Sequence, residues 1–119
     1  MSNSSDLMAQ QCQPQADALS AQQVLHYLSA VEGWEQDGQH IVKTFSFQNY
    51  YETLAFINAI AYVVHAQDHH PELIVTYNRC VIRFDTHSVN EGKGGLSVND
   101  FICAAKVDAV FDLSFSKRV

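Results

Sequence analysis

Helical and strand periodicities alternate along most of the chain. Over residues 20–33 apolar positions recur at helical spacing, with Ser20 and Gln23 placed as a capping box at the start. Residues 41–47 alternate in the manner of a strand, and the Asp37-Gly38 pair before them is typical of a hairpin turn. This part of the sequence therefore predicts one helix followed by two paired strands.

The second half of the chain repeats that order. Residues 48–67 are apolar on most sides, so we expect a central, largely buried helix that ends before Pro71. Two strands follow over residues 71–87, joined by a turn that contains Asn78. Beyond a glycine-rich loop, Ser97 and an acidic residue three positions later resemble the capping box of a last helix.

The order helix, two strands, helix, two strands, helix predicts an α+β fold. In such a fold a four-stranded antiparallel sheet carries its helices on one face. Residues 1–18 are rich in Ser, Gln, Asn and Asp, so we expect a flexible polar leader there and a single domain over residues 19–119. The last strand places Arg83, Asp85 and His87 on the face away from the core, where substrate or a second subunit can bind.

Composition narrows the classes of protein. The 119 residues are 47% hydrophobic and 17% charged, which is typical of a compact globular chain. A net charge of −6 with scattered basic residues argues against direct nucleic-acid contact, and no run reaches the roughly 20 apolar residues of a membrane span. The three cysteines, Cys12, Cys80 and Cys103, form no C-x-x-C pair, so we expect packing residues in a reducing, cytoplasmic setting.

The segment HAQDHHP, residues 65–71, holds three of the six histidines. His65 and His69 have the i, i+4 spacing of a helical metal site, but no Glu adjoins His65 and the helix is expected to end near His69. His69 and His70 are neighbours and therefore point in different directions. Taken alone, they are better explained as polar groups at a helix C-terminus, where the dipole favours imidazolium, so we predict no metal site.

The wider spacing gives a stronger signal. His65 is followed after three residues by His-His-Pro, then by an aromatic residue, a histidine and an aspartate, namely His69, His70, Pro71, Tyr77, His87 and Asp100. This set resembles the signature of the pterin-4a-carbinolamine dehydratases. The likeness also includes the stretches IVKTFSF, VTYNRCVIRFDTH and GGLSVNDF, and it extends over roughly residues 20–110.

The resemblance implies a fold and a reaction. Members of that family have four antiparallel strands with helices on one side, and they associate as dimers or tetramers through the sheet edge and helices. They dehydrate 4a-hydroxytetrahydropterin to quinonoid dihydropterin, with no metal or organic cofactor. The reaction recycles the pterin used by aromatic amino acid hydroxylases, so a functional link to phenylalanine hydroxylase is implied.

The resemblance also implies roles for individual residues. His69 and His87 are expected to be the acid–base pair, since an imidazole pKa near 6.5 suits both proton transfers at neutral pH. His70 belongs to the same catalytic set and is expected to bind and orient the pterin. The expected substrate contacts are His70, Asp100, Pro71 and Tyr77. Asp100 either holds a histidine tautomer or accepts a pterin N–H.

A different class of function stays open. Some members of the family act as dimerisation cofactors for a homeodomain transcription factor, a role that uses surface helices and not the histidines. A pterin-binding protein without turnover is a third possibility. The enzyme requires His69 and His87, whereas a protein that only binds a partner tolerates their loss.

Overall fold

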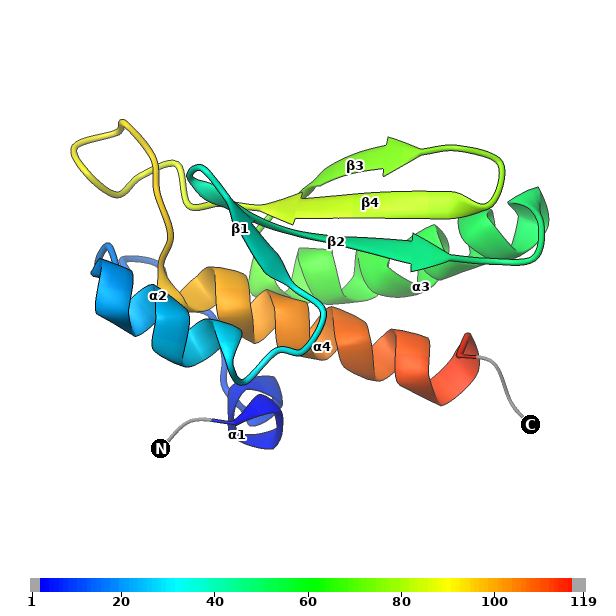
Figure 1. The fold of residues 1–119 in the computed structure, drawn as a ribbon, viewed down its shortest axis with the longest axis horizontal. Coiled ribbons are helices and arrows are strands. Elements are labelled where there is room, and N and C mark those ends of the chain that lie inside the picture. The colour runs from blue at the N-terminus through cyan, green and yellow to red at the C-terminus, as the bar shows by residue number, and fades with distance from the viewer. Residues whose placement is uncertain (1–2, 117–119) are drawn as a thin grey trace.

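The computed structural model describes residues 3–116. Its elements are α1 (Ser4–Ala9), α2 (Ala21–Leu28), β1 (Glu35–Asp37), β2 (His40–Ser46), α3 (Tyr50–Gln67), β3 (Glu72–Val75), β4 (Arg79–Phe84) and α4 (Val98–Ser114). The four strands form one antiparallel sheet in the order β1-β2-β4-β3, and the helices lie together on one side of it (Figure 1). The predicted fold class is confirmed.

Local sequence signals fix the ends of several elements. Ser20 and Gln23 form the predicted capping box of α2, because each side chain accepts the backbone N–H of the other. The β1–β2 hairpin turns at Gly38, which has a positive φ of 62°, and Asp37 pairs with His40 across the turn. These short-range rules set where the strands and helices begin.

The core lies between the sheet and α4. Side chains alternate along β2 and β4, so that Phe45, Ile82 and Phe84 face the helices and are buried. Helix α4 is buried mainly between Asn99 and Val107, and it packs against the other three helices. The helix at the centre of the fold is therefore α4.

Helix α3 differs from the prediction that it would be central and largely buried. It buries only three side chains, those of Thr53, Phe56 and Ile60, whereas Tyr51 is 80% and Tyr62 is 77% exposed. All helices of the described chain lie on one face of a four-stranded sheet, so a helix at the side of that layer has one face without a neighbour (Figure 1). Its apolar outer face is therefore open to solvent.

The first residues also differ from the expected flexible leader. Residues 4–9 form α1, which is capped by the Asn3 side chain and packs against α4 through Leu7, a fully buried residue. One apolar side chain among polar neighbours gives too little periodicity to predict such a helix. Tertiary contact with α4, not helix propensity, stabilises it.

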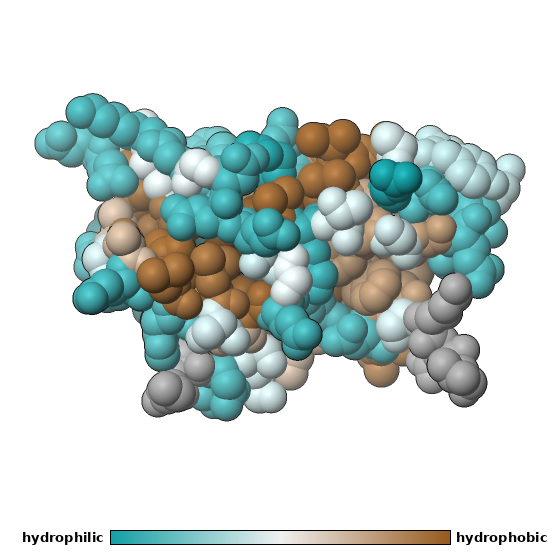
Figure 2. All heavy atoms as spheres, viewed as in Figure 1, coloured by the Kyte–Doolittle hydropathy of each residue, from teal (hydrophilic) through white to brown (hydrophobic). Residues whose placement is uncertain are grey.

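Strand β3 forms one edge of the sheet. Its residues Ile74 and Val75 are partly exposed, and apolar atoms are visible on the surface where β3 runs (Figure 2). An edge strand with free backbone groups and apolar side chains is suited to pairing with another chain. Within residues 3–116, no helix combines the length and the hydrophobicity that crossing a membrane requires.

Candidate active site

The histidine segment begins where α3 ends. Asp68 adopts the left-handed conformation, with φ of 50°, and its N–H donates to the His65 carbonyl at 3.2 Å. This cap stops the helix and turns the chain toward β3. His69 and His70 consequently lie in the link between α3 and β3, beside the C-terminal end of the antiparallel strand β4.

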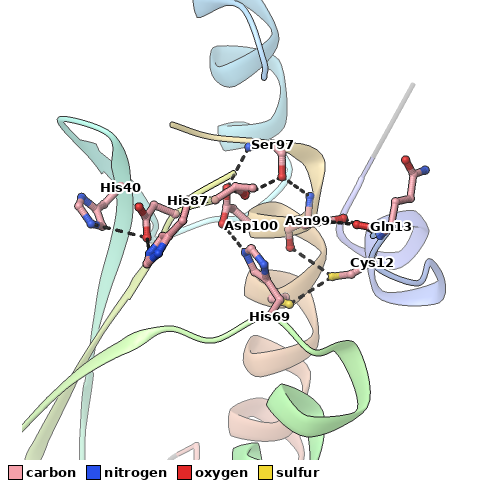
Figure 3. A network of polar contacts seen from close by, with 11 residues as sticks. Cys12, Gln13, His40, His69, His87, Ser97, Asn99 and Asp100 are labelled. Atoms are coloured by element: carbon pink, nitrogen blue, oxygen red, sulfur yellow. Dashed lines mark hydrogen bonds and ion pairs between the residues drawn. The ribbon is translucent and has the colours of Figure 1, made fainter. Parts of the chain in front are cut away.

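Asp100 is the anchor beneath this link. It lies in the first turn of α4 and has no solvent exposure. Its Oδ2 accepts two hydrogen bonds of 2.9 Å, from the Ser97 backbone N–H and from the Thr86 hydroxyl. Its Oδ1 lies 2.6 Å from His69 Nε2 (Figure 3). The predicted capping box of α4 thus also holds a histidine from a distant segment.

His69 is held on two sides. Its ring stacks on Phe84, with centroids 5.9 Å apart and planes 10° apart, and its side chain is 12% exposed. Burial opposes protonation of the imidazole, but the hydrogen bond to Asp100 and the charge of that carboxylate outweigh burial and raise the pKa of His69. The imidazolium is therefore more populated near neutral pH than in a free histidine.

The second ring nitrogen of His69 faces outward. Nδ1 has no hydrogen-bond partner among the described residues, and no buried polar side-chain atom there is without a partner. Nδ1 must therefore reach solvent. A ring with one nitrogen fixed on a carboxylate and the other accessible is arranged to exchange a proton with a bound molecule.

A cavity of about 410 Å³ opens above this ring. The side chains around it include those of His69, His70, Asp85, Thr86, His87 and Cys12. A larger hollow of about 730 Å³ lies between α1, α2 and α4, but its ionic pair, Lys43 Nζ to Asp108 Oδ1 at 2.9 Å, is internal, and Trp34 Nε1–H satisfies the other carboxylate oxygen. The smaller cavity is the one with reactive groups, so we take it as the candidate site.

The other histidines of the cavity are exposed. The side chain of His87 is 85% exposed, and its Nε2 lies 3.1 Å from Asp85 Oδ1 (Figure 3). His40 from β2 does not border the cavity, but its Nε2 approaches the same carboxylate oxygen at 3.8 Å. His70 lies with its Nε2 3.9 Å from the exposed Asp68 carboxylate. The side chains of His70 and His87 are mostly exposed, so these two rings have room to turn toward a ligand.

Three residues expected to contact substrate lie elsewhere. Tyr77 stacks on Tyr50, with centroids 6.4 Å apart, at the opposite end of β4 from His87. A six-residue strand between them spans about 20 Å. Pro71 borders the apolar α3–β3 groove instead of the cavity. Asp100 does not border the cavity: it is fully buried, and both of its oxygens have partners within the protein, one of which is His69.

Sequence reasoning missed several residues of the cavity. Asp85 was placed on the same face as His87 by the expected strand alternation, but it was given no role in the site. Thr86 and Cys12 had no signal, since their contacts with the site join segments far apart in the sequence. The described residues contain no group of three or more His, Cys, Asp or Glu side chains arranged to hold a metal ion.

Comparison with known proteins connects this geometry to one family. Residues 17–110 match the family model described as pterin 4 alpha carbinolamine dehydratase. A Bdellovibrio bacteriovorus protein named "Putative pterin-4-alpha-carbinolamine dehydratase" is 53% identical over 116 residues, which cover 98% of this chain and 97% of that protein. A Stenotrophomonas maltophilia protein of the same name is 55% identical over 85 residues, 70% of each chain.

Solved structures give the same result. The crystal structure of a transcriptional coactivator/pterin dehydratase from Brucella melitensis matches with a TM-score of 0.71 and 28% identity, covering 78% of this chain and 97% of that one. A pterin dehydratase-like protein described as a RuBisCO assembly factor in the alpha-carboxysome matches with a TM-score of 0.56 and 26% identity. It covers 66% of this chain and 89% of its own.

Proposed function

Because the chain belongs to the pterin 4 alpha carbinolamine dehydratase family, we propose that it converts 4a-hydroxytetrahydropterin to quinonoid dihydropterin and water. One observation carries the proposal. The buried His69–Asp100 pair opens onto a cavity that also contains His70 and His87. This places a supported imidazole and two mobile imidazoles around one space, as two proton transfers require.

His69 is the acid in this proposal. The 4a-hydroxyl is a poor leaving group and departs as water once it receives a proton. The pKa of His69 is raised, so its imidazolium is available near neutral pH, and the accessible Nδ1–H is the group that donates. Asp100 keeps the other nitrogen fixed and stabilises the positive charge, so it is a positioning residue.

His87 is the base, and His70 orients the substrate. Formation of the quinonoid bond releases a proton from a ring nitrogen of the pterin. His87 is exposed and borders the same cavity, and Asp85 accepts from its Nε2–H, which leaves its Nδ1 free to take that proton. His70 stands at the cavity mouth and is free to hydrogen-bond to the pterin. No metal or organic cofactor enters these steps.

The test is the rate of dehydration, with the 4a-hydroxy substrate generated in situ. We expect the wild type to accelerate the reaction and His69→Ala to lose on the order of 10²-fold, the usual scale of general acid–base catalysis. His26→Ala is the matched control, because His26 lies on α2 and does not border the cavity. It should retain wild-type activity.

The outcomes separate the two classes of function. A folded wild type that gives no acceleration contradicts the dehydratase proposal and favours binding alone, the role that the names of the two solved relatives suggest. Equal activity in the wild type and His69→Ala contradicts the site assignment but not the reaction. Activity lost in His69→Ala and kept in His26→Ala supports both.

The wider setting belongs to the same proposal. A cytoplasmic dehydratase of this type recycles the pterin product of an aromatic amino acid hydroxylase such as phenylalanine hydroxylase.

We also propose a homo-oligomer, since the β3 edge and the outer face of α3 expose Ile74, Val75, Tyr51 and Tyr62. Light scattering gives its mass, and Tyr62→Glu, a charge on the α3 face, should shift it toward the monomer.

A further inference from the structure

Two cysteines meet at the floor of the cavity. Cys12 precedes α2 and Cys103 lies in the second turn of α4, yet their Sγ atoms are 3.5 Å apart (Figure 3). Cys12 is half-buried and borders the cavity, whereas Cys103 is 1% exposed behind it. One thiol is thus reachable from the cavity and the other is reachable only through the first.

Backbone contacts fix this meeting. The Cys12 N–H donates to Gln67 Oε1 at 2.7 Å, which ties residue 12 to the end of α3. The Gln13 N–H donates to Asn99 Oδ1 at 2.9 Å, and Asn99 Nδ2 donates back to the Gln13 carbonyl at 2.8 Å. The segment around Cys12 is therefore attached to α3 and α4 on either side of the thiol. The contact between the two sulfur atoms is therefore held by hydrogen bonds on both sides of Cys12.

The two thiols differ in reactivity. A hydrogen bond from Cys103 and the positive charges of His69 and Lys106 lower the pKa of Cys12, although burial opposes them. The hydrogen bond to Cys12 and burial both raise the pKa of Cys103. The remaining cysteine, Cys80, is fully buried in β4, where burial raises its pKa to about 11. Cys12 is consequently the nucleophile of the three.

We propose that Cys12 and Cys103 form a peroxide-sensitive thiol pair that joins the N-terminal segment covalently to α4 at the floor of the cavity. The Cys12 thiolate attacks hydrogen peroxide, the O–O bond breaks, and the sulfur becomes a sulfenic acid as water leaves. The Cys103 sulfur then attacks the Cys12 sulfur, an S–S bond forms, and the hydroxyl leaves as a second water. Both thiols are oxidised and the peroxide is reduced.

The geometry requires little movement. A disulfide has a sulfur–sulfur bond of about 2.0 Å. The atoms are already 3.5 Å apart, so an approach of about 1.5 Å closes the bond. Because Cys12 borders the cavity beside His69, closure moves part of the cavity wall. An effect on turnover rests on the proposed dehydratase function, whereas the modification itself does not.

The experiment uses the full reduced chain and a small excess of hydrogen peroxide. We expect the intact mass to fall by two hydrogen atoms and the free thiols to fall from three to one. Peptide mapping should place the link between Cys12 and Cys103. The melting temperature should rise on the order of 10 °C, because the bond closes a long loop, and dithiothreitol should reverse every change.

Variants separate the steps. Cys103→Ala should stop at a sulfenic acid on residue 12, which dimedone traps, and Cys12→Ala should lose the fast reaction. Cys80→Ala is the control and should cross-link as the wild type does. A folded wild type that keeps three free thiols, forms only links between chains, or accumulates sulfinic acid at Cys12 overturns the proposal. None of these readouts depends on dehydratase activity, so the two proposals fail independently.

Discussion

The two sides of the cavity hold their histidines in different ways. On one side, which we call the fixed wall, His69 is packed on Phe84 and bound to Asp100, itself bonded to Thr86 and Ser97. On the other side, the open rim, His70 and His87 are mostly exposed and meet carboxylates at 3.9 and 3.1 Å. The same residue type therefore occurs in one cavity as a preorganised group and as a mobile one.

This difference follows from where each histidine lies in the fold. The fixed wall is built at the first turn of the central helix α4, where backbone N–H groups and a buried carboxylate are already present. The open rim is built on two connecting segments, the α3–β3 link that carries His70 and the segment after β4 that carries His87. Burying a polar imidazole lowers the stability of the protein unless the ring is hydrogen-bonded, so a buried histidine needs fixed partners. An exposed imidazole is hydrated by water and needs none.

The largest difference between the two sides should appear in stability when the carboxylate of the fixed wall is removed. Asp100→Ala leaves the His69 ring, the Thr86 hydroxyl and the Ser97 N–H without their buried acceptor. We expect the free energy of unfolding to fall by about 3 kcal/mol or more, measured by urea denaturation. A loss below about 1 kcal/mol would mean that water replaces Asp100 and that the wall is not preorganised.

Chemical rescue distinguishes the two sides in activity. His69→Gly and His87→Gly should each lose on the order of 10²-fold in dehydration rate. Removal of His69 leaves a gap between Phe84 and Asp100 that fits free imidazole, so rescue of that variant should saturate with imidazole concentration. The exposed His87 leaves no such gap, so its rescue should rise linearly. If imidazole rescue saturates in both variants, or in neither, the proposed difference between the fixed wall and the open rim is contradicted.

The sequence predicted the open rim better than the fixed wall. Strand alternation placed Asp85 and His87 on one face. In the structure β4 ends at Phe84, and the two side chains that follow it lie 3.1 Å apart. The capping spacing of Ser97 and Asp100 predicted the start of α4. It did not decide whether Asp100 faces a histidine or a ligand, because that depends on how α4 packs against the α3–β3 link.

Other differences have the same cause. The apolar pattern of residues 48–67 predicted a helix, but how much of that helix is buried depends on the neighbours that surround it. Cys12 had no local signal, since its partners Gln67 and Cys103 are 55 and 91 residues away. Tyr77 fitted the family spacing, yet the length of β4 places it at the other end of the sheet. Sequence periodicity predicts the helices and strands, whereas tertiary packing determines which residues they contact.

The pH dependence of the free energy of unfolding should show a smaller effect of the fixed wall than Asp100→Ala does. The folded protein raises the pKa of His69, so this pair contributes stability that is fully present below the unfolded pKa and is lost as pH rises through the folded pKa. The stability difference between the wild type and Asp100→Asn should therefore be larger at about pH 5.5 than at about pH 9.

Histidine NMR titration tests the cause directly. The pKa of His69 should be above 6.5 in the wild type and should fall in Asp100→Asn, because the charge and the hydrogen bond of the carboxylate are the groups that outweigh burial. Burial, the largest single effect, lowers this pKa, and only the weaker charges of Cys12 and Asp85 still oppose burial in the variant. A His69 pKa unchanged by Asp100→Asn would contradict the assignment of Asp100 as the anchor.

The smallest effect on stability is expected at the carboxylate of the open rim. Asp85 accepts a hydrogen bond from His87 and lies 3.8 Å from His40. Asp100 accepts one from His69 in the same way, so Asp85→Ala is the matched counterpart of Asp100→Ala. The partners of Asp85 reach water, which replaces the lost acceptor, and we expect a loss of no more than about 1 kcal/mol in urea denaturation. Activity should fall more than stability, because His87 loses the group that orients it. A loss of stability comparable to that of Asp100→Ala would show that the rim is as fixed as the wall, and the division of roles between His69 and His87 would then lose its physical basis.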